Sequence, residues 1–288
     1  MIIGAVYKKV EFYGEMRKDM GNDRFEFGKN WKKYLDNLSD KQIKEAQRSL
    51  QQWFGLKNLE GKSFLDIGSG SGLFSLAARN LGARVFSFDY DENSVGCTKY
   101  LKNKFYKGDR QWQVEQGDIL DKEYLSKFEK YDIVYSWGVL HHTGHMYQAL
   151  QNASDLVADN GTLFIAIYND QGSISKMWKV IKKTYNDVPG VCKGFISVPF
   201  FVSLWGARAV KDILKGTPFL TWKTYVKKRG MSPWTDAVDW VGGYPFEVAK
   251  PEEIFDFFHK RGYTLEKMMT KRGGNGCNQF VFARRNKA

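Results

Sequence analysis

Cysteine is scarce in this chain, and long apolar runs are absent. The three cysteines, Cys97, Cys192 and Cys277, lie far apart in 288 residues, so the sequence predicts neither a disulfide framework nor a cysteine-rich zinc cluster. No apolar stretch reaches the roughly 18 residues of a transmembrane helix, and the charged beginning of the chain does not resemble a signal peptide. These absences favour a cytoplasmic protein in a reducing environment.

The remaining composition is that of a globular protein. Hydrophobic residues make up 43% of the sequence and charged residues 26%, without internal repeats. The net charge is +12, and most of this excess falls between residues 171 and 230, which hold twelve Lys or Arg and two acids. Such a segment fits an anionic partner (phosphate, nucleic acid or an acidic membrane surface), and it fits a solvated basic face equally well.

The middle of the chain alternates between short apolar runs and amphipathic segments. The apolar runs predict strands, the segments between them predict helices, and the alternation predicts an α/β fold with a doubly wound, mostly parallel sheet. The expected strands are residues 63–67, 84–89, 112–116, 131–136 and 162–168, and the helices are 73–81, 92–105, 121–128 and 146–157. A helix at 251–260 and two short closing strands at 263–269 and 279–284 indicate an antiparallel end to the sheet.

Four segments follow from this pattern. They are an N-terminal leader and helix (1–59), an α/β core (60–170), a basic, aromatic helical cap inserted into the core (171–245) and the C-terminal completion of the core (246–288). Within the cap, an apolar run at residues 195–205 is expected to be broken by Pro199. This run predicts either the core of the cap or a face that rests on a membrane.

The strongest motif is FLDIGSGSGL at residues 64–73, where a predicted strand runs into a glycine-rich turn and then a helix. Three glycines allow a tight turn and a close approach of a ligand. A dinucleotide fingerprint would place its third glycine at residue 73, and a P-loop would require Gly-Lys followed by Ser or Thr, so neither motif is present. The candidate binding residues here are Asp66, Gly68, Ser69, Gly70 and Gly72.

Further candidates follow the next three predicted strands. Ligands of parallel α/β sheets bind at the carboxyl ends of the strands. A carboxylate there can accept the hydroxyls of a ribose or the amino group of an adenine, and a neighbouring apolar ring can pack against the base. In chain order the residues are Asp89, Tyr90, Asp118, Ile119, Ser136 and Trp137. The sequence therefore predicts a nucleoside site at this edge of the sheet.

Together these motifs resemble the class I S-adenosylmethionine (SAM)-dependent methyltransferases, in the branch similar to small-molecule O-methyltransferases of ubiquinone biosynthesis. The resemblance covers about residues 60–170 and, loosely, 250–285. It implies a seven-stranded sheet with an antiparallel last strand, with SAM as the cofactor and S-adenosylhomocysteine as the product. It also implies that the nucleoside-site residues named above hold this cofactor. The cap departs from the common pattern of the superfamily.

Two histidines are the candidate catalytic residues. His141 and His142 follow the fourth predicted strand, where the transferred methyl group is expected, and a histidine can accept a proton from a hydroxyl. The alternative is that one or both orient the loop or bind the acceptor without proton transfer. No carboxylate or cysteine accompanies them at the spacing of metal ligands, so no metal site is predicted.

Acceptor binding is assigned to residues after the fifth strand and to a glycine-rich aromatic loop at 240–247, which is expected to form a lid or a pocket wall. The candidates are Tyr168, Asn169, Trp240 and Tyr244. Residues 27–31 of the leader could close over the cofactor or could pack elsewhere. Residues 273–278 are expected to form a hairpin turn.

The sequence thus predicts methyl transfer from SAM to a small, anionic acceptor, such as a phosphorylated or lipid-linked sugar or a quinol precursor, with oxygen favoured over nitrogen. Two alternatives stay open. One is a tRNA methyltransferase that uses the basic cap to bind RNA, although no recognised RNA-binding module is present. The other is a SAM-binding protein without catalysis. Peripheral contact with a membrane is also compatible with the cap.

Overall fold

The computed structural model describes residues 25, 27–36, 38–229 and 232–285, which surround one seven-stranded sheet of order β3-β2-β1-β4-β5-β7-β6. β7 pairs antiparallel with β5 and with β6, and the pairings among the first five strands are parallel. The predicted fold class is therefore confirmed. The strands are β1 (Ser63–Ile67), β2 (Arg84–Asp89), β3 (Trp112–Gln116), β4 (Tyr131–Trp137), β5 (Val157–Tyr168), β6 (Tyr263–Met269) and β7 (Cys277–Arg284).

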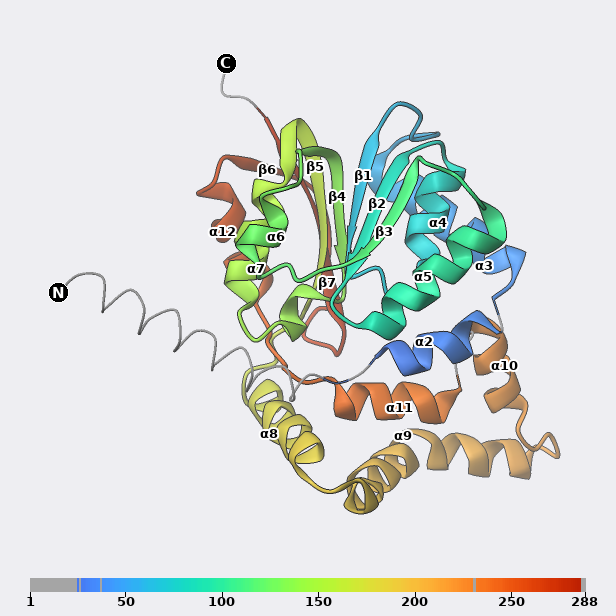
Figure 1. Ribbon diagram of the computed structural model, residues 1–288. Helices are drawn as coiled ribbons and strands as arrows, with labels where there is room; N and C mark the ends of the chain where they lie inside the picture. The colour runs from blue at the N-terminus through green and yellow to red at the C-terminus, as the bar shows by residue number, and fades with distance from the viewer. Residues whose placement is uncertain (1–24, 26, 37, 230–231, 286–288) are drawn as a thin grey trace.

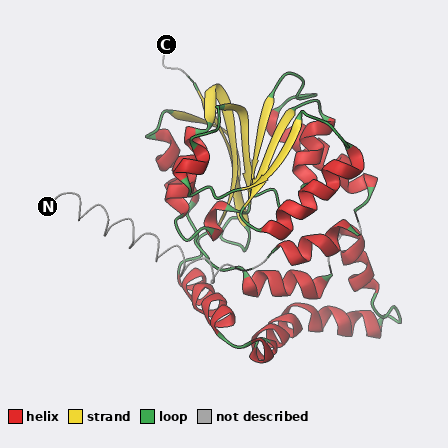
Figure 2. Ribbon diagram, viewed as in Figure 1, coloured by secondary structure: helices red, strands yellow, loops and turns green. Residues whose placement is uncertain are grey.

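Helices cover both faces of the sheet (Figures 1 and 2). One face carries α3 (Asp40–Phe54), α4 (Leu73–Asn80) and α5 (Glu92–Phe105), and the other carries α6 (Lys122–Leu125), α7 (Met146–Asp155) and α12 (Pro251–His259). Because successive strand residues point to opposite faces, Phe64 of β1 joins the first core and Leu65 joins the second. Every residue of β1 is buried, as expected for a central strand covered on both faces.

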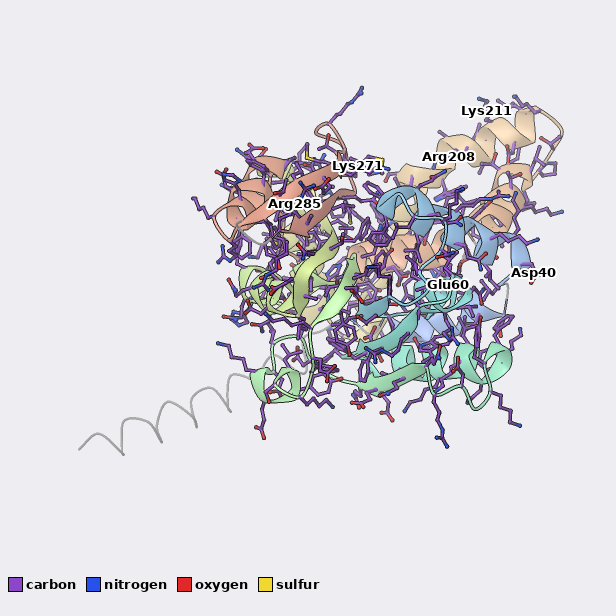
Figure 3. The ribbon with its side chains drawn as sticks, turned by 90° about the horizontal axis from the view of Figure 1, so that it is seen from above. Asp40, Glu60, Arg208, Lys211, Lys271 and Arg285 are labelled. Atoms are coloured by element: carbon purple, nitrogen blue, oxygen red, sulfur yellow. The ribbon has the colours of Figure 1, made fainter. Side chains whose placement is uncertain are left out.

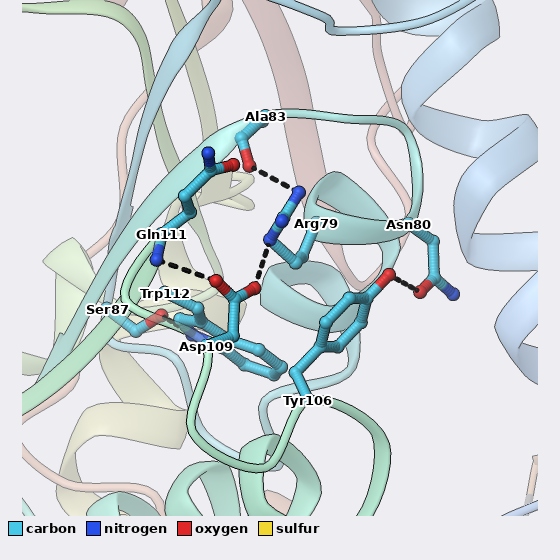
Figure 4. Close-up of polar contacts among 8 residues, drawn as sticks. All are labelled: Arg79, Asn80, Ala83, Ser87, Tyr106, Asp109, Gln111 and Trp112. Carbon is cyan, nitrogen blue, oxygen red and sulfur yellow. Dashed lines mark hydrogen bonds and ion pairs between the residues drawn. The ribbon is translucent and has the colours of Figure 1, made fainter.

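A polar network fixes β3 against α4 and β2 (Figure 4). Arg79 Nε lies 2.6 Å from Asp109 Oδ2, and Asp109 Oδ1 accepts the backbone N–H of Gln111 at 2.8 Å. Burial alone would raise the pKa of Asp109, but these hydrogen bonds and the Arg79 charge hold it below its usual value. Trp112 donates to Ser87 Oγ at 2.9 Å across the β3–β2 pair. The network therefore helps to hold β2, which ends at Asp89, in place.

Four cap helices lie beyond the carboxyl ends of the parallel strands (Figure 1). They are α8 (Ser173–Asp187), α9 (Gly194–Leu214), α10 (Leu220–Arg229) and α11 (Pro233–Gly242), and α11 contacts both α8 and α9. The expected break at Pro199 is wrong, because α9 runs through it. The proline lies on the exposed side of the helix, where water can satisfy the carbonyl group that loses its donor.

One segment of the cap bears on the membrane prediction. Gly190–Leu214 is long and apolar enough to cross a membrane by length and composition, and an 18-residue window within it has a mean hydropathy of 1.4 and is 11% buried. A single helix that meets this criterion is weak evidence for a membrane span, so the sequence-based expectation of no spanning segment is not overturned. The expectation rested on an unbroken apolar run, whereas a helix can be apolar on average while carrying a few charges.

Two other expectations differ from the structure. The predicted helix 121–128 is reduced to α6, and Phe128 instead packs its ring 4.8 Å from that of Phe86. The leader contains a helix that sequence reasoning did not assign, α2 (Gly28–Leu35), and residues 1–24 lie outside the described part of the chain. The predicted hairpin turn before β7 is confirmed by the antiparallel pairing of β6 with β7.

Candidate active site

The glycine turn connects β1 to α4 through three residues with positive φ. Gly68, Gly70 and Gly72 have φ values of +74°, +54° and +80°, a region that glycine adopts without steric cost. A Cβ atom at Gly68 would lie 2.4 Å from the side chain of Val139, and one at Gly72 would lie 2.8 Å from the backbone of Thr98. The turn is thus clamped between the segment after β4 and helix α5, which explains why no larger residue fits.

Asp66 lies beneath this turn and is buried. Ser75 Oγ of α4 donates to Asp66 Oδ2 at 2.5 Å, and Ser87 Oγ donates in turn to Ser75 Oγ at 2.8 Å. Burial raises the pKa of Asp66 to about 7, although the bond from Ser75 opposes the rise. In the structure this predicted cofactor residue holds the start of α4 against β1 and β2.

Asp89 ends β2 beside the turn. Its Oδ2 accepts the backbone N–H of Gly70 at 2.9 Å, and its Oδ1 accepts that of Asp91 at 2.9 Å. Burial raises its pKa to about 6, and the two backbone hydrogen bonds oppose the rise. A carboxylate has about four lone-pair sites, so Asp89 can also accept the hydroxyls of a ribose.

The other predicted cofactor residues occupy the same edge of the sheet in different ways. Tyr90 and Trp137 are exposed, and Ile119 is buried. Asp118 Oδ1 accepts the backbone N–H of Leu120 at 2.9 Å, as expected for a turn. The hydroxyls of the two serines are engaged within the protein: Ser69 Oγ lies 2.9 Å from Thr98 Oγ1, and Ser136 Oγ donates to the carbonyl of Ile67 at 3.0 Å.

Helix α2 of the leader lies against α5 next to the glycine turn (Figure 1). The backbone N–H of Gly28 donates to Asp91 Oδ2 at 2.7 Å. The indole nitrogen of Trp31 lies 3.1 Å from the position that a Cβ atom at Gly70 would take. The structure thus brings residues 27–31 to the predicted cofactor site, and Trp31 is a site residue that sequence reasoning did not single out by itself.

The two candidate catalytic histidines belong to the short 3₁₀ helix η1 (Leu140–His142) after β4. His141 is fully buried, and within the described residues its Nε2 has no hydrogen-bond partner. Its Nδ1 lies 3.4 Å from the backbone nitrogen of Tyr168, and the ring centroids of these residues are 3.9 Å apart. Burial, with His142 and Lys182 nearby, places the pKa of His141 well below its usual value. His141 is therefore neutral at physiological pH.

His142 is half-buried and has a defined tautomer. Its Nδ1 lies 2.6 Å from the carbonyl oxygen of Pro245, and a carbonyl oxygen can only accept a hydrogen bond. Nδ1 therefore carries the proton, and Nε2 presents its lone pair. Burial lowers the pKa of His142 to about 3, since the bond to Pro245 only partly compensates and Lys182 adds to the lowering.

Aromatic rings from the core, the leader and the cap surround this pair. Tyr168 at the end of β5 lies 5.5 Å from Trp240 of α11 and 5.4 Å from Phe246, measured between ring centroids. Phe27 of the leader lies 5.1 Å from His142. Among the predicted acceptor residues, Tyr168 and Trp240 are thus brought together at the histidines.

The remaining two acceptor candidates serve neighbouring loops. Asn169 donates to the carbonyl of Gly274 at 3.1 Å and accepts from Asn278 at 3.0 Å, so its side chain holds the turn before β7. Tyr244 accepts the backbone N–H of Phe25 at 3.0 Å through its carbonyl group. This bond ties the leader to the loop between α11 and α12.

Sequence reasoning missed Lys182, a fully buried lysine of α8. Its ammonium group donates to the carbonyl of Trp240 and lies 4.5 Å from the Trp240 ring and 4.9 Å from the Phe246 ring. Burial lowers its pKa to about 7, although Asp239 opposes the shift. The signal available in the sequence was a single lysine in a basic segment, which nothing distinguished from its exposed neighbours.

The arrangement fits a bound SAM molecule at the glycine turn. The positive φ values let the backbone approach a ligand closely, and Asp89 can still accept hydrogen bonds from a ribose. The two histidines belong to the same segment as Val139, whose side chain packs against Gly68. Within the described ranges, no group of three or more His, Cys, Asp or Glu residues could hold a metal ion.

Comparison with known proteins supports a methyltransferase. The family model described as a methyltransferase domain matches residues 38–215, and the chain belongs to this family. The fold is that of the class I SAM-dependent methyltransferases, so the resemblance seen in the sequence is confirmed at the level of the family.

Individual relatives are similar over part of their length. The ribosomal protein L11 methyltransferase of Helicobacter hepaticus is 31% identical over 132 residues, 45% of this chain and 38% of that protein. The ubiquinone biosynthesis O-methyltransferase of Glaesserella parasuis is 29% identical over 111 residues, 38% of this chain and 47% of that protein. The matches thus span less than half the length of either relative.

Among solved structures, the magnesium protoporphyrin IX methyltransferase of Synechocystis PCC 6803, crystallised with bound S-adenosylhomocysteine, superposes with a TM-score of 0.50. The alignment covers 84% of this chain and 81% of that one, at 16% sequence identity. This likeness supports the fold.

Proposed function

We propose that this chain transfers a methyl group from SAM to an oxygen atom of a small, anionic acceptor. The observation that carries the proposal is His142, whose Nδ1 is fixed by the Pro245 carbonyl so that Nε2 offers a lone pair. His142 belongs to the short helix that directly follows Val139, the residue that packs against Gly68 of the glycine turn. The ubiquinone biosynthesis O-methyltransferase similarity supports an oxygen acceptor. When bound, SAM supplies the electrophilic methyl group, so the protein has to align the acceptor and manage its proton.

In this proposal His142 accepts a hydrogen bond from the acceptor hydroxyl and orients its oxygen. A histidine with a pKa of about 3 is neutral at physiological pH and therefore ready to accept. An anionic acceptor beside the ring would stabilise the imidazolium ion and raise this pKa, which brings His142 closer to the range of an effective general base. His141 is fully buried and takes the role of a positioning residue through its contact with Tyr168.

Negative charge on the acceptor is supported by the cationic groups of the cap. Lys182 lies close enough to both histidines to lower their pKa values. Residues 171–230, which include Lys182, carry a net charge of +10 in the sequence, and the helices of this segment lie beyond the carboxyl ends of the parallel strands (Figure 1). These charges favour the approach and binding of an acidic substrate.

The cofactor is tested first by calorimetric titration of the full chain with SAM, S-adenosylhomocysteine and NAD. Micromolar binding of both sulfur nucleosides is expected, with loss of at least about tenfold in Asp89→Ala because the ribose loses its acceptor. Asp159→Ala is the matched control, since this exposed aspartate is on β5 and pairs with Arg284. Binding of NAD in preference to SAM would contradict the proposal.

The acceptor is tested by following transfer of labelled methyl groups from SAM to a panel of phenols, catechols, phosphorylated sugars and neutral amines. Transfer to acidic hydroxyl compounds is expected. Transfer only to neutral amines would rule out the proposed substrate class. Methylation of tRNA in a salt-sensitive manner would favour the RNA alternative, and SAM binding without any turnover would favour a non-catalytic protein.

A further inference from the structure

The outer side of α9 is apolar and uncovered. Phe195, Val202 and Ile213 are 82%, 57% and 65% exposed, and Val198 lies between the first two. At 100° per residue these positions fall on one side of the helix, so they form a continuous stripe. The residues just beyond either end of α9, Val191 and Phe219, are exposed as well. A monomer in water gains nothing from such a stripe, which indicates a contact surface.

The inner side of the same helix is firmly packed into the cap. Trp205 lies 4.9 Å from Tyr225 and 6.1 Å from Trp222 between ring centroids, and Phe201 lies 5.3 Å from Trp234. Near the end of the helix, Asp212 accepts hydrogen bonds from the hydroxyl and backbone N–H of Thr221. A helix that crossed a bilayer would lose these contacts and would carry Asp212 into hydrocarbon. The packing therefore favours a helix that lies along a surface.

Positive charge is concentrated on the same segment. The exposed side chains of Arg208, Lys211 and Lys215 follow one another along the second half of α9, and Figure 3 shows Arg208 and Lys211 on this outer helix, away from the sheet. Residues 171–230 carry +10 of the net +12. A helix with an apolar side and a Lys- and Arg-rich polar side is the usual form of an element that binds at the interface of an anionic bilayer.

We infer that the outer side of α9 docks on a lipid surface that carries anionic headgroups. A second copy of the chain is a poorer occupant, because two segments of +10 would be brought face to face. RNA is a poorer occupant as well, because the stripe is mainly aliphatic and offers few rings for bases to stack on. The apolar stripe enters the interface, while the long basic side chains reach toward the headgroups.

This docking is independent of the proposed methyl transfer, because the stripe lies on the far side of α9 from the helices that approach the histidines. α11, with Trp240, lies between α9 and helix α2 of the leader (Figure 1). Loss of lipid binding should therefore leave SAM binding unchanged. The two proposals can fail separately.

The test is flotation of the full chain with vesicles of phosphatidylglycerol and phosphatidylcholine, beside vesicles of phosphatidylcholine alone. The chain should bind the anionic vesicles, less strongly as salt is raised. Phe195→Glu/Ile213→Glu should weaken binding at least about tenfold, because it removes two exposed apolar groups that would enter the bilayer and adds two charges that anionic lipids repel. Leu56→Glu/Met268→Glu is the matched control, since both residues are exposed and apolar and lie outside the cap.

Equal thermal midpoints and SAM affinities in the two double variants would show that both fold. Binding that is lost only in the α9 variant supports the inference. Four results would overturn it: no vesicle binding by the unmodified chain, equal binding to phosphatidylcholine alone, equal loss in both variants, or self-association in sedimentation that the α9 variant abolishes in place of lipid binding.

Discussion

His142 and Pro245 are 103 residues apart in the chain, yet the imidazole Nδ1 of one lies 2.6 Å from the carbonyl oxygen of the other. His142 comes from the end of β4, and Pro245 comes from the loop that leaves the cap. Helix α11, which precedes that loop, receives the ammonium group of Lys182 at the carbonyl of Trp240. The packing of the cap onto the sheet and the tautomer of His142 thus depend on neighbouring residues of the same segment.

Replacing His142 tests whether its free nitrogen takes part in methyl transfer. His142→Ala should lower turnover about 100- to 10,000-fold, the usual contribution of a positioned proton acceptor, with little change in SAM affinity. His142→Asn can still donate to Pro245 but lacks the Nε2 lone pair, so it should be impaired to a similar degree. Steady-state kinetics with the identified acceptor measure both effects. Full activity of the Asn variant would reduce His142 to a structural role. His259→Ala, at an exposed histidine of α12, serves as the control.

The position of His142 at the site could be predicted from the sequence, but its orientation could not. Parallel strands bring their carboxyl ends to one edge of the sheet. The alternation of strands and helices therefore predicts that Asp89, Asp118 and His142 lie at the same edge. The contacts of Lys182 and Trp31 depend on how the cap and leader pack onto that edge. No periodicity in the sequence encodes such long-range packing, and the sequence does not distinguish a buried lysine from an exposed one. The predicted break at Pro199 was wrong because the energetic cost of a proline inside a helix depends on whether it lies on the exposed or the buried side.

Lys182 should make the stability of the protein rise with pH. Its pKa falls from 10.5 to about 7 on folding, so the unfolded chain binds more protons between these values. Lys182 should therefore increase the free energy of unfolding by about 1.4 kcal/mol per pH unit from pH 7 toward pH 10. The stability that Lys182 contributes at high pH is lost as pH falls through 7. Urea titrations at several pH values measure the slope. Lys182→Met should remove it, whereas Lys183→Met, at an exposed neighbour, should retain it. An unchanged slope in Lys182→Met would contradict the assignment.

Asp66 should act in the opposite direction at lower pH. Burial raises its pKa from 3.8 to about 7, so the folded state holds a proton that the unfolded chain releases between these values. The stability that this group contributes is present below pH 4 and is lost as pH rises through 7. Asp66→Asn, which cannot ionise and can keep the bond from Ser75, should therefore gain stability relative to the unmodified protein as pH rises from 4 to 7. Chemical denaturation of both proteins and of Asp159→Asn across this range decides the matter, since parallel curves for all three would refute the shift.

Gly68 and Gly61 share nearly the same φ, +74° and +73°, and they differ in their surroundings. A Cβ atom at Gly61 would meet nothing within 4 Å, whereas one at Gly68 would lie 2.4 Å from Val139. Gly61→Ala should therefore cost only the backbone term of about 1 kcal/mol, without an effect on SAM affinity.

Gly68→Ala adds the displacement of Val139 to the same backbone term, for a total loss of about 2–4 kcal/mol in the free energy of unfolding. Because Val139 directly precedes η1, the displacement should also reach the histidines and weaken both SAM binding and turnover. Urea denaturation and calorimetric titration of the two variants separate the effects. If both variants lose the same stability and bind SAM alike, the glycine at residue 68 is required only for its conformation, and the turn is not coupled to the catalytic loop through Val139.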